Sequence, residues 1–175
     1  MKPVFLIGYM GCGKSTLARK LARRLRAACA DTDALVEARE GAAVADLFRN
    51  EGETRFREIE REVLDGVIDR GEAAVVSTGG GLPVWSDNME RMNRAGTTVY
   101  LRRSAESIAR RLSPYGISRR PRLCGLSGDA LVAFMRRDMA VREPYYARAR
   151  WTVDCDALTD REVVELILNH METEH

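Results

Sequence analysis

The stretch Gly8-Tyr9-Met10-Gly11-Cys12-Gly13-Lys14-Ser15-Thr16 decides the fold of this chain. It matches the phosphate-loop pattern G-x-x-x-x-G-K-[ST], in which two glycines, a lysine and a hydroxyl residue hold the fixed positions. The apolar run at 4–7 predicts a buried parallel strand before the loop, and apolar residues at helical spacing predict a helix over 14–27 after it. A glycine-rich loop between a strand and a helix predicts a binding site for a nucleoside triphosphate, although it does not identify the reaction.

The residue types in this loop indicate how phosphate would be held. Glycines let the backbone turn its N–H groups inward around phosphate oxygens, and the start of the following helix adds partial positive charge. Lys14 is expected to reach the β- and γ-phosphates, and the hydroxyl of Ser15 to bind Mg²⁺. An ordinary glycine-rich turn is the alternative. Cys12 is either a small residue at a variable position or a thiol open to oxidation.

Length and composition set broad limits on function. The 175 residues predict a single domain, 1–175, with room for a mobile flap. A formal net charge of +2 gives no reason to expect nucleic acid or a membrane surface as a partner. The four cysteines lack metal-ligand spacing and are expected to be reduced thiols. No segment has the length of a membrane span or the form of a signal peptide, so we expect a cytoplasmic protein.

Two carboxylates follow a short second strand, predicted at 28–30, in the run Asp31-Thr32-Asp33. Ligands of open parallel sheets bind outside the carboxyl ends of the strands, so this run is expected to face the same crevice as the phosphate loop. If the strand continued that far, Asp31 and Asp33 would point in similar directions, one toward Mg²⁺ and the other toward the nucleophile. The alternative is that Asp31 or Thr32 caps a helix over 34–39.

The middle of the chain holds an arginine and a glycine run with two interpretations each. Gly52 is expected to end one short helix before an amphipathic helix over 53–69. On that second helix, Glu60 lies three residues after Arg57, where it either orients the arginine or forms a surface ion pair of little worth. A strand at 73–77 runs into Gly79-Gly80-Gly81, which indicates close approach to a ligand or a loose turn.

The rest of the chain completes an alternation of strands and helices. A strand at 97–101 and a helix at 104–112 precede the segment 113–127, whose prolines, glycines and arginines show no clear period. That segment predicts either a lid that closes over the triphosphate or a disordered basic flap. Pro144 is expected to kink or break a helix over 128–149. With a fifth strand at 151–153 and a closing helix at 163–168, the pattern predicts an α/β fold with a doubly wound, five-stranded parallel sheet.

Taken together, these motifs resemble those of the shikimate kinases along essentially the whole chain. The resemblance implies a phosphate-loop fold like that of nucleoside-monophosphate kinases. It also implies transfer of the γ-phosphate of ATP to the 3-hydroxyl of shikimate, with Mg²⁺ as cofactor and a monomeric enzyme. The motifs that carry it are the phosphate loop, Asp31-Thr32-Asp33, Phe56-Arg57 with Glu60, Gly79-Gly80-Gly81, Arg120-Pro121, and Arg142-Glu143-Pro144-Tyr145-Tyr146.

The resemblance also implies roles for individual residues, within an acid-binding segment at about 33–61 and a lid at about 113–126. Catalysis would involve Lys14, Asp33 and Arg120, and Mg²⁺ would be held by Ser15 and by Asp31 through water. Shikimate would contact Asp33, Arg57, Gly79, Gly80, Gly81 and Arg142. The nucleotide would contact Gly11, Cys12, Gly13, Lys14, Ser15, Thr16, Arg111 and Arg120.

Two departures from the family pattern stand out. Arg122 occupies a lid position that is more often apolar, and 154–157 lacks the basic residue that some members place beside the adenine. A gluconate kinase, a nucleoside-monophosphate kinase or a nucleotide-dependent switch would share the loop and the sheet. A gluconate kinase would not need Arg57, the glycine triplet and Arg142 together, so these residues favour shikimate as acceptor. A nucleoside-monophosphate kinase would need a second set of phosphate-binding arginines, which is not evident in the sequence.

Overall fold

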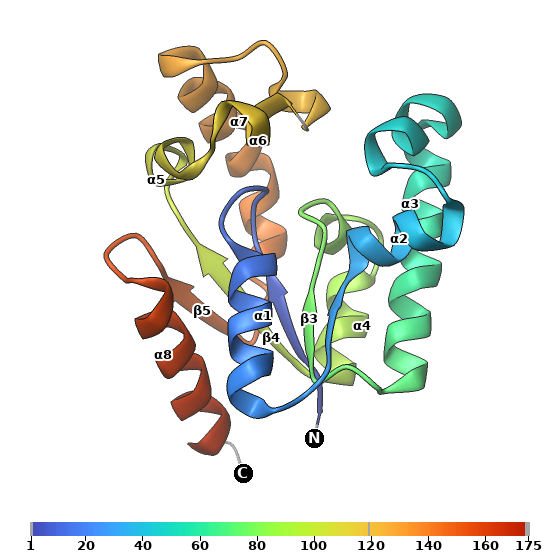
Figure 1. The fold of residues 1–175 in the computed structure, drawn as a ribbon, viewed down its shortest axis with the longest axis vertical. Coiled ribbons are helices and arrows are strands. Elements are labelled where there is room, and N and C mark those ends of the chain that lie inside the picture. The colour runs from blue at the N-terminus through green and yellow to red at the C-terminus, as the bar shows by residue number, and fades with distance from the viewer. Residues whose placement is uncertain (1, 119, 174–175) are drawn as a thin grey trace.

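A computed structural model describes residues 2–118 and 120–173, so residue 119 of the predicted lid lies outside the described part. Five strands form one sheet in the order β2-β3-β1-β4-β5, and every neighbouring pair is parallel (Figure 1). This arrangement confirms the predicted doubly wound α/β fold. The strands are β1 (Val4–Ile7), β2 (Cys29–Asp31), β3 (Val75–Ser77), β4 (Thr97–Arg102) and β5 (Trp151–Asp154).

Helices cover both faces of the sheet. Helices α1 (Lys14–Leu25) and α8 (Asp160–Thr173) lie on one face, and α4 (Asn88–Ala95) and α7 (Gly128–Tyr146) on the other, with α3 (Val44–Arg70) beside α4 (Figure 1). A central strand between two helical layers has no face left for water, which is why β1 is apolar throughout and at most 1% exposed. None of the described helices is long and apolar enough to span a bilayer.

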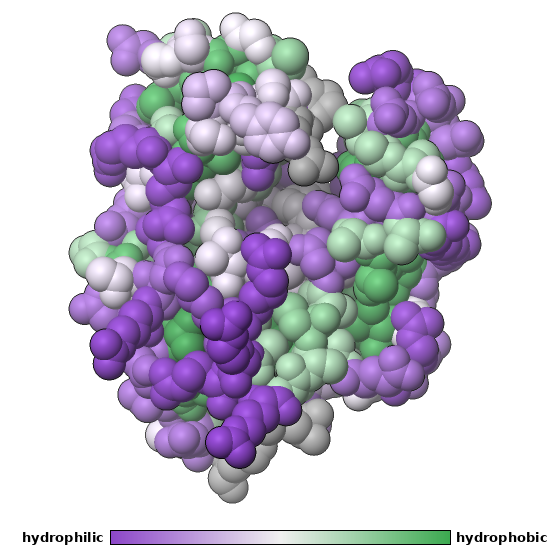
Figure 2. Space-filling view, viewed as in Figure 1, coloured by the Kyte–Doolittle hydropathy of each residue, from purple (hydrophilic) through white to green (hydrophobic). Residues whose placement is uncertain are grey.

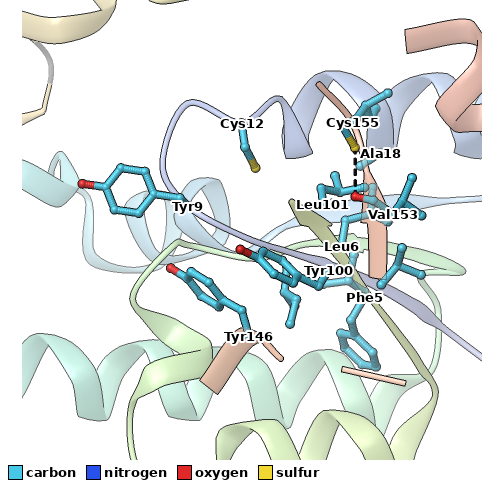
Figure 3. Packing of buried hydrophobic residues seen from close by; sticks show 14 of the residues in the cluster. Phe5, Leu6, Tyr9, Cys12, Ala18, Tyr100, Leu101, Tyr146, Val153 and Cys155 are labelled. Atoms are coloured by element: carbon cyan, nitrogen blue, oxygen red, sulfur yellow. Dashed lines mark hydrogen bonds between the residues drawn. The ribbon is translucent and has the colours of Figure 1, made fainter. Parts of the chain in front are cut away.

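The core extends from the sheet up to the phosphate loop (Figure 3). The rings of Tyr100 in β4 and Tyr146 in α7 pack with their centroids 5.2 Å apart. Tyr9 and Cys12 of the loop are 1% and 0% exposed, so the loop is fixed on the core through its own side chains. The interpretation of Cys12 as a thiol open to oxidation is therefore wrong, because the sulfur is buried.

The second strand and the next helix meet without a connecting loop. β2 ends at Asp31, and α2 (Thr32–Glu40) begins at the following residue. The Asp31 carboxylate caps this helix by accepting from the backbone N–H groups of Asp33 at 3.1 Å and Ala34 at 3.4 Å. The capping alternative is thus confirmed, and the argument from strand alternation is wrong, because Asp33 lies in the first helical turn.

Two predicted interruptions have different outcomes. Gly52 has φ 81° and ψ 167° inside α3, so the expected break is confirmed. Pro144 was expected to kink or break its helix, and the break is wrong, because α7 continues through Pro144 and ends at Tyr146. A proline at this position removes only the helical hydrogen bond from its own nitrogen to the carbonyl of Ala140. Ala140 is exposed, so water can hydrogen-bond to that carbonyl instead.

The predicted lid contains more regular structure than its sequence indicates. After α5 (Ala105–Arg111) come a short helix, α6 (Pro114–Ser118), and a 3₁₀ turn, η2 (Pro121–Leu123); a similar turn, η1 (Leu82–Val84), follows the glycine triplet. Leu123 is buried in the core and anchors this segment. Helices α5 and α6 rise on one side of the molecule and α2 with the start of α3 on the other, and the surface between them is hollowed (Figures 1 and 2).

Candidate active site

The phosphate loop connects β1 to α1 and holds its lysine close to its own backbone. Gly8 and Gly11 have φ values of 145° and 80°, and a side chain at Gly8 would press on the carbonyl of Leu101 at 2.9 Å. Lys14 is only 7% exposed, and its Nζ donates to the carbonyl oxygens of Gly8 at 2.8 Å and Tyr9 at 2.9 Å. The ammonium group is thus positioned over the loop before any phosphate binds.

Hydroxyl and carboxylate oxygens gather at the start of α1. Ser15 Oγ donates to Asp31 Oδ2 at 2.6 Å and lies 3.2 Å from Ser77 Oγ at the end of β3. Among the described residues, no three His, Cys, Asp or Glu side chains cluster as a metal site would require. One carboxylate with a hydroxyl beside a phosphate loop nevertheless fits Mg²⁺, which takes most of its ligands from phosphate and water.

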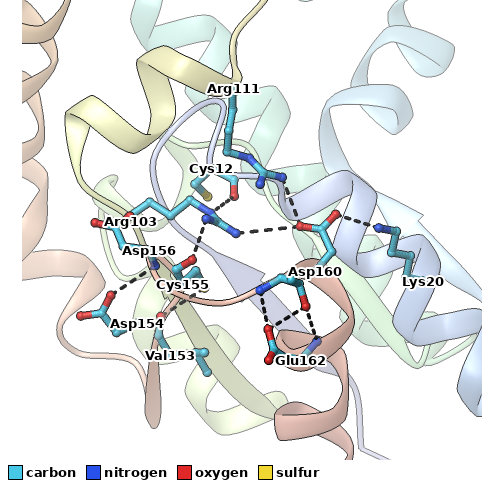
Figure 4. Close-up of polar contacts among 11 residues, drawn as sticks. Cys12, Lys20, Arg103, Arg111, Val153, Asp154, Cys155, Asp156, Asp160 and Glu162 are labelled. Carbon is cyan, nitrogen blue, oxygen red and sulfur yellow. Dashed lines mark hydrogen bonds and ion pairs between the residues drawn. The ribbon is translucent and has the colours of Figure 1, made fainter.

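A buried arginine, Arg103, contacts the backbone of the phosphate loop (Figure 4). Arg103 is 3% exposed, and it donates from Nε to the Cys12 carbonyl at 3.0 Å and from Nη1 to the Cys155 carbonyl at 2.7 Å. Asp160, the first residue of α8, lies 3.9 Å from Arg103 and 3.2 Å from Arg111. Arg111 is thereby held beside Gly13, because its Nη2 would lie 3.5 Å from a Cβ atom added to that glycine.

The three consecutive glycines after β3 each contact a different predicted site residue. A side chain at Gly79 would collide with the carboxylate of Asp33, and one at Gly81 with the guanidinium of Arg57. Gly80 accepts a hydrogen bond from Arg142 Nη1 at 3.2 Å. The same glycine faces the phosphate loop, since a side chain there would lie 3.2 Å from the Met10 nitrogen. The structure thus brings both arginines and Asp33 to one short segment beside the loop.

Burial raises the pKa of two carboxyl groups beside this segment, those of Asp33 and Glu60. Desolvation, reinforced by the nearby Asp31 carboxylate, raises the pKa of Asp33 against the opposing charge of Lys14. Desolvation also raises the pKa of Glu60 to about 7, although Arg57 opposes the shift. The side chains of the Arg57–Glu60 ion pair are 12% and 2% exposed, so the surface-pair interpretation is wrong and Glu60 orients the arginine.

Sequence reasoning missed the residues that hold the second arginine. Arg142 is 7% exposed, its Nε lies 3.2 Å from Asp138 Oδ2, and its guanidinium carbon lies 5.8 Å from the centroid of the Tyr9 ring. Tyr146 donates through its hydroxyl to the Gly80 carbonyl at 2.6 Å. The four-residue spacing of Asp138 and Arg142 on one helix was the only local signal of this group.

The remaining predicted residues lie in the phosphate loop, in α1 and in the predicted lid. Gly11, Cys12 and Gly13 form the loop itself, and Thr16 lies exposed in the first turn of α1. Arg120 lies in the predicted lid, where its Nη1 donates to the carbonyl of Gly116. The contacts of Arg120 within the lid differ from the phosphate contact that the resemblance implies.

Comparisons with known proteins agree with this geometry. A family model described as shikimate kinase matches residues 10–172. A shikimate kinase from Parabacteroides distasonis is 44% identical over 95% of this chain and 95% of its own length. The crystal structure of shikimate kinase from Bacteroides thetaiotaomicron gives a TM-score of 0.86 at 38% identity, covering 98% of this chain and 97% of that one. A shikimate kinase from Acinetobacter baumannii, solved in complex with shikimate, gives 0.88 at 30%, covering 99% and 94%.

Proposed function

The chain belongs to the shikimate kinase family, and we propose that it binds ATP on the phosphate loop and shikimate against the glycine triplet. It is accordingly a kinase that moves the γ-phosphate of ATP to the 3-hydroxyl of shikimate, yielding shikimate 3-phosphate and ADP. One observation supports this assignment most strongly: Asp33, Arg142 and Arg57 lie against Gly79, Gly80 and Gly81 in turn, and Gly80 faces the phosphate loop.

Two guanidinium groups give the pocket its preference for an acid. Arg57 and Arg142 would bind the shikimate carboxylate through charged hydrogen bonds, each worth about 1.5–3 kcal/mol. Glu60 and Asp138 fix the orientation of these arginines before the acid arrives. A neutral polyol such as gluconolactone would leave both arginines without that anion, so it would bind far more weakly.

Proton removal and charge neutralisation are assigned to separate groups. Asp33 would accept the proton of the attacking hydroxyl, because a raised pKa makes its carboxylate a stronger base. Lys14 would exchange its two carbonyl partners for the β- and γ-phosphates. Arg120 would leave the Gly116 carbonyl when the lid closes, and an arginine in that role contributes roughly 10³–10⁵ in rate.

Ser15 and Asp31 are the residues that would hold Mg²⁺, which when bound neutralises phosphate charge. Arg111 would lie near the adenine, since it is held beside Gly13. We further infer that 1–175 works as one monomeric, cytoplasmic domain, with the acid-binding segment at about 33–61 and the lid at about 113–126. The single five-stranded sheet, from which both segments extend, supports one domain with these two segments.

The assignment is tested by following ADP release from MgATP with shikimate, with gluconate and with no acceptor. We expect ADP only with shikimate, and none from a Lys14→Met variant. Turnover with gluconate alone would identify a different acceptor. Acceptor-independent hydrolysis or tight nucleotide binding without turnover would favour a nucleotide-dependent switch.

A further inference from the structure

Residues from the phosphate loop, from the lid and from α7 itself contact a single carboxylate, that of Asp138 in α7. Tyr9 of the phosphate loop donates its hydroxyl to Oδ2 at 2.8 Å. Arg142 approaches the same oxygen with Nε at 3.2 Å. Arg122 of the lid approaches Oδ1 with Nη2 at 2.9 Å. The side chains of Asp138 and Arg142 are each only 9% exposed, so their contact is largely shielded from water, whereas the side chain of Arg122 is 47% exposed.

The geometry at Asp138 leaves Arg142 ready for an anion. Among contacts between described residues, Arg142 uses Nε for Asp138 and Nη1 for the Gly80 carbonyl, which leaves Nη2 for an incoming carboxylate. Burial and the hydrogen bond to Asp138 raise the pKa of Tyr9, so the phenol stays protonated and donates. One carboxylate thus neutralises only one of two guanidinium groups, and the cluster keeps positive charge next to the acid pocket.

The lid reaches this cluster through Arg122. This residue lies in η2, and its guanidinium carbon also lies 5.9 Å from the centroid of the Phe134 ring in α7. The next residue, Leu123, is fully buried. The lid is therefore anchored in the core by Leu123 and contacts α7 through Arg122, and the charged contact of Arg122 shares its acceptor group with the arginine of the acid pocket.

We propose that Asp138 is a positioning residue that couples docking of the lid to the orientation of Arg142. Arg122 on Oδ1 and Arg142 on Oδ2 restrain the same carboxylate, so each contact stabilises the other. The lid then docks best over a pocket whose Arg142 is held for the acceptor's carboxylate. Arg122 becomes a determinant of shikimate affinity although it touches no substrate. This inference rests on the proposed function of the same site.

A double-mutant cycle tests the coupling. Shikimate and ADP affinities are measured by calorimetry for wild type, Asp138→Asn, Arg122→Gln and the double variant. Asparagine keeps the shape of the side chain and an oxygen for Tyr9 but removes the charge. We expect about a tenfold loss of shikimate affinity for Asp138→Asn, the size of one charged hydrogen bond, and a smaller loss for Arg122→Gln. The double variant should match Asp138→Asn, and ADP affinity should stay within about twofold throughout.

Two further variants separate coupling from general damage. Arg122→Lys should recover most of the shikimate affinity, because an ammonium can still pair with Asp138. Arg137→Leu removes an exposed arginine next to Asp138 in the sequence and should leave both affinities unchanged. Losses that add in the double variant, an unchanged affinity in Arg122→Gln, or equal losses for shikimate and ADP would overturn the coupling. Wild-type protein that binds ADP but not shikimate would instead overturn the proposed function.

Discussion

Replacing Arg57 by alanine tests the acid pocket most directly. In the structure Arg57 lies on Gly81 and pairs with Glu60, whose side chain is 2% exposed. Loss of one charged hydrogen bond to shikimate, at about 1.5–3 kcal/mol, corresponds to a rise in KM of roughly 10- to 150-fold. ADP affinity should not change, because Arg57 contacts Gly81 and Glu60, whereas Lys14 contacts the phosphate loop.

The same substitution also leaves a buried carboxylate without its partner. Breaking a buried pair on one side typically costs about 3–5 kcal/mol of stability. The penalty here should be smaller at neutral pH, because Glu60 already has a pKa of about 7 and takes up a proton once the arginine is gone. A second variant, Arg57→Ala with Glu60→Gln, removes the buried charge and should regain stability without regaining shikimate affinity.

Steady-state kinetics with either substrate varied, ADP calorimetry and urea unfolding measure these effects separately. Arg55→Ala is the matched control, because Arg55 forms an exposed pair with Glu58 on the same helix and should change neither KM nor stability by much. The reasoning fails if the double variant binds shikimate as wild type does, since Arg57 would then be structural. It also fails if both substrates lose affinity equally.

Three further predictions concern the lid, Glu60 and the metal. Arg120→Ala should lower kcat more than it raises KM for shikimate, because its phosphate contact forms on closure; an unchanged kcat would remove it from the mechanism. Glu60 has its pKa raised from 4.5 to about 7, so the folded chain holds a proton that the unfolded chain has released, and stability falls as pH rises between these values. Glu60→Gln should flatten that slope in urea midpoints, and an unaltered slope would assign it to another group. Asp31→Asn keeps a good helix cap, so it should raise the Mg²⁺ concentration for half-maximal rate while sparing the melting temperature.

The sequence predicted those parts of the molecule that depend on local pattern. The phosphate loop, the central strands and the break at Gly52 follow from residue types within a few positions, so they were readable without the structure. Family resemblance then identified Asp33, Arg57 and Arg142 as a group. Their meeting on three successive glycines depends on how β3, α2, α3 and α7 pack together.

Contacts between residues far apart in the sequence, and exceptions to local propensity, could not be predicted from the sequence. Tyr9 and Asp138 are 129 residues apart, and nothing in either neighbourhood indicates the pairing. Asp31 combines the end of a strand with a helix cap, which alternation along a strand cannot predict. The lid looked irregular because its prolines begin α6 and η2, where a missing N–H is tolerated, and its buried Leu123 has no periodic neighbours.

The glycine triplet also limits how this enzyme can diverge. None of Gly79, Gly80 and Gly81 has a φ in the left-handed region, so their backbone would accept any residue. What excludes a side chain is the neighbour on each one: a carboxylate, the phosphate loop or a guanidinium. A larger residue at any of these positions therefore displaces that neighbour from its present place or requires a change in it. Descendants with another acceptor should accordingly show paired replacements here, one in the triplet and one in the group that faces it.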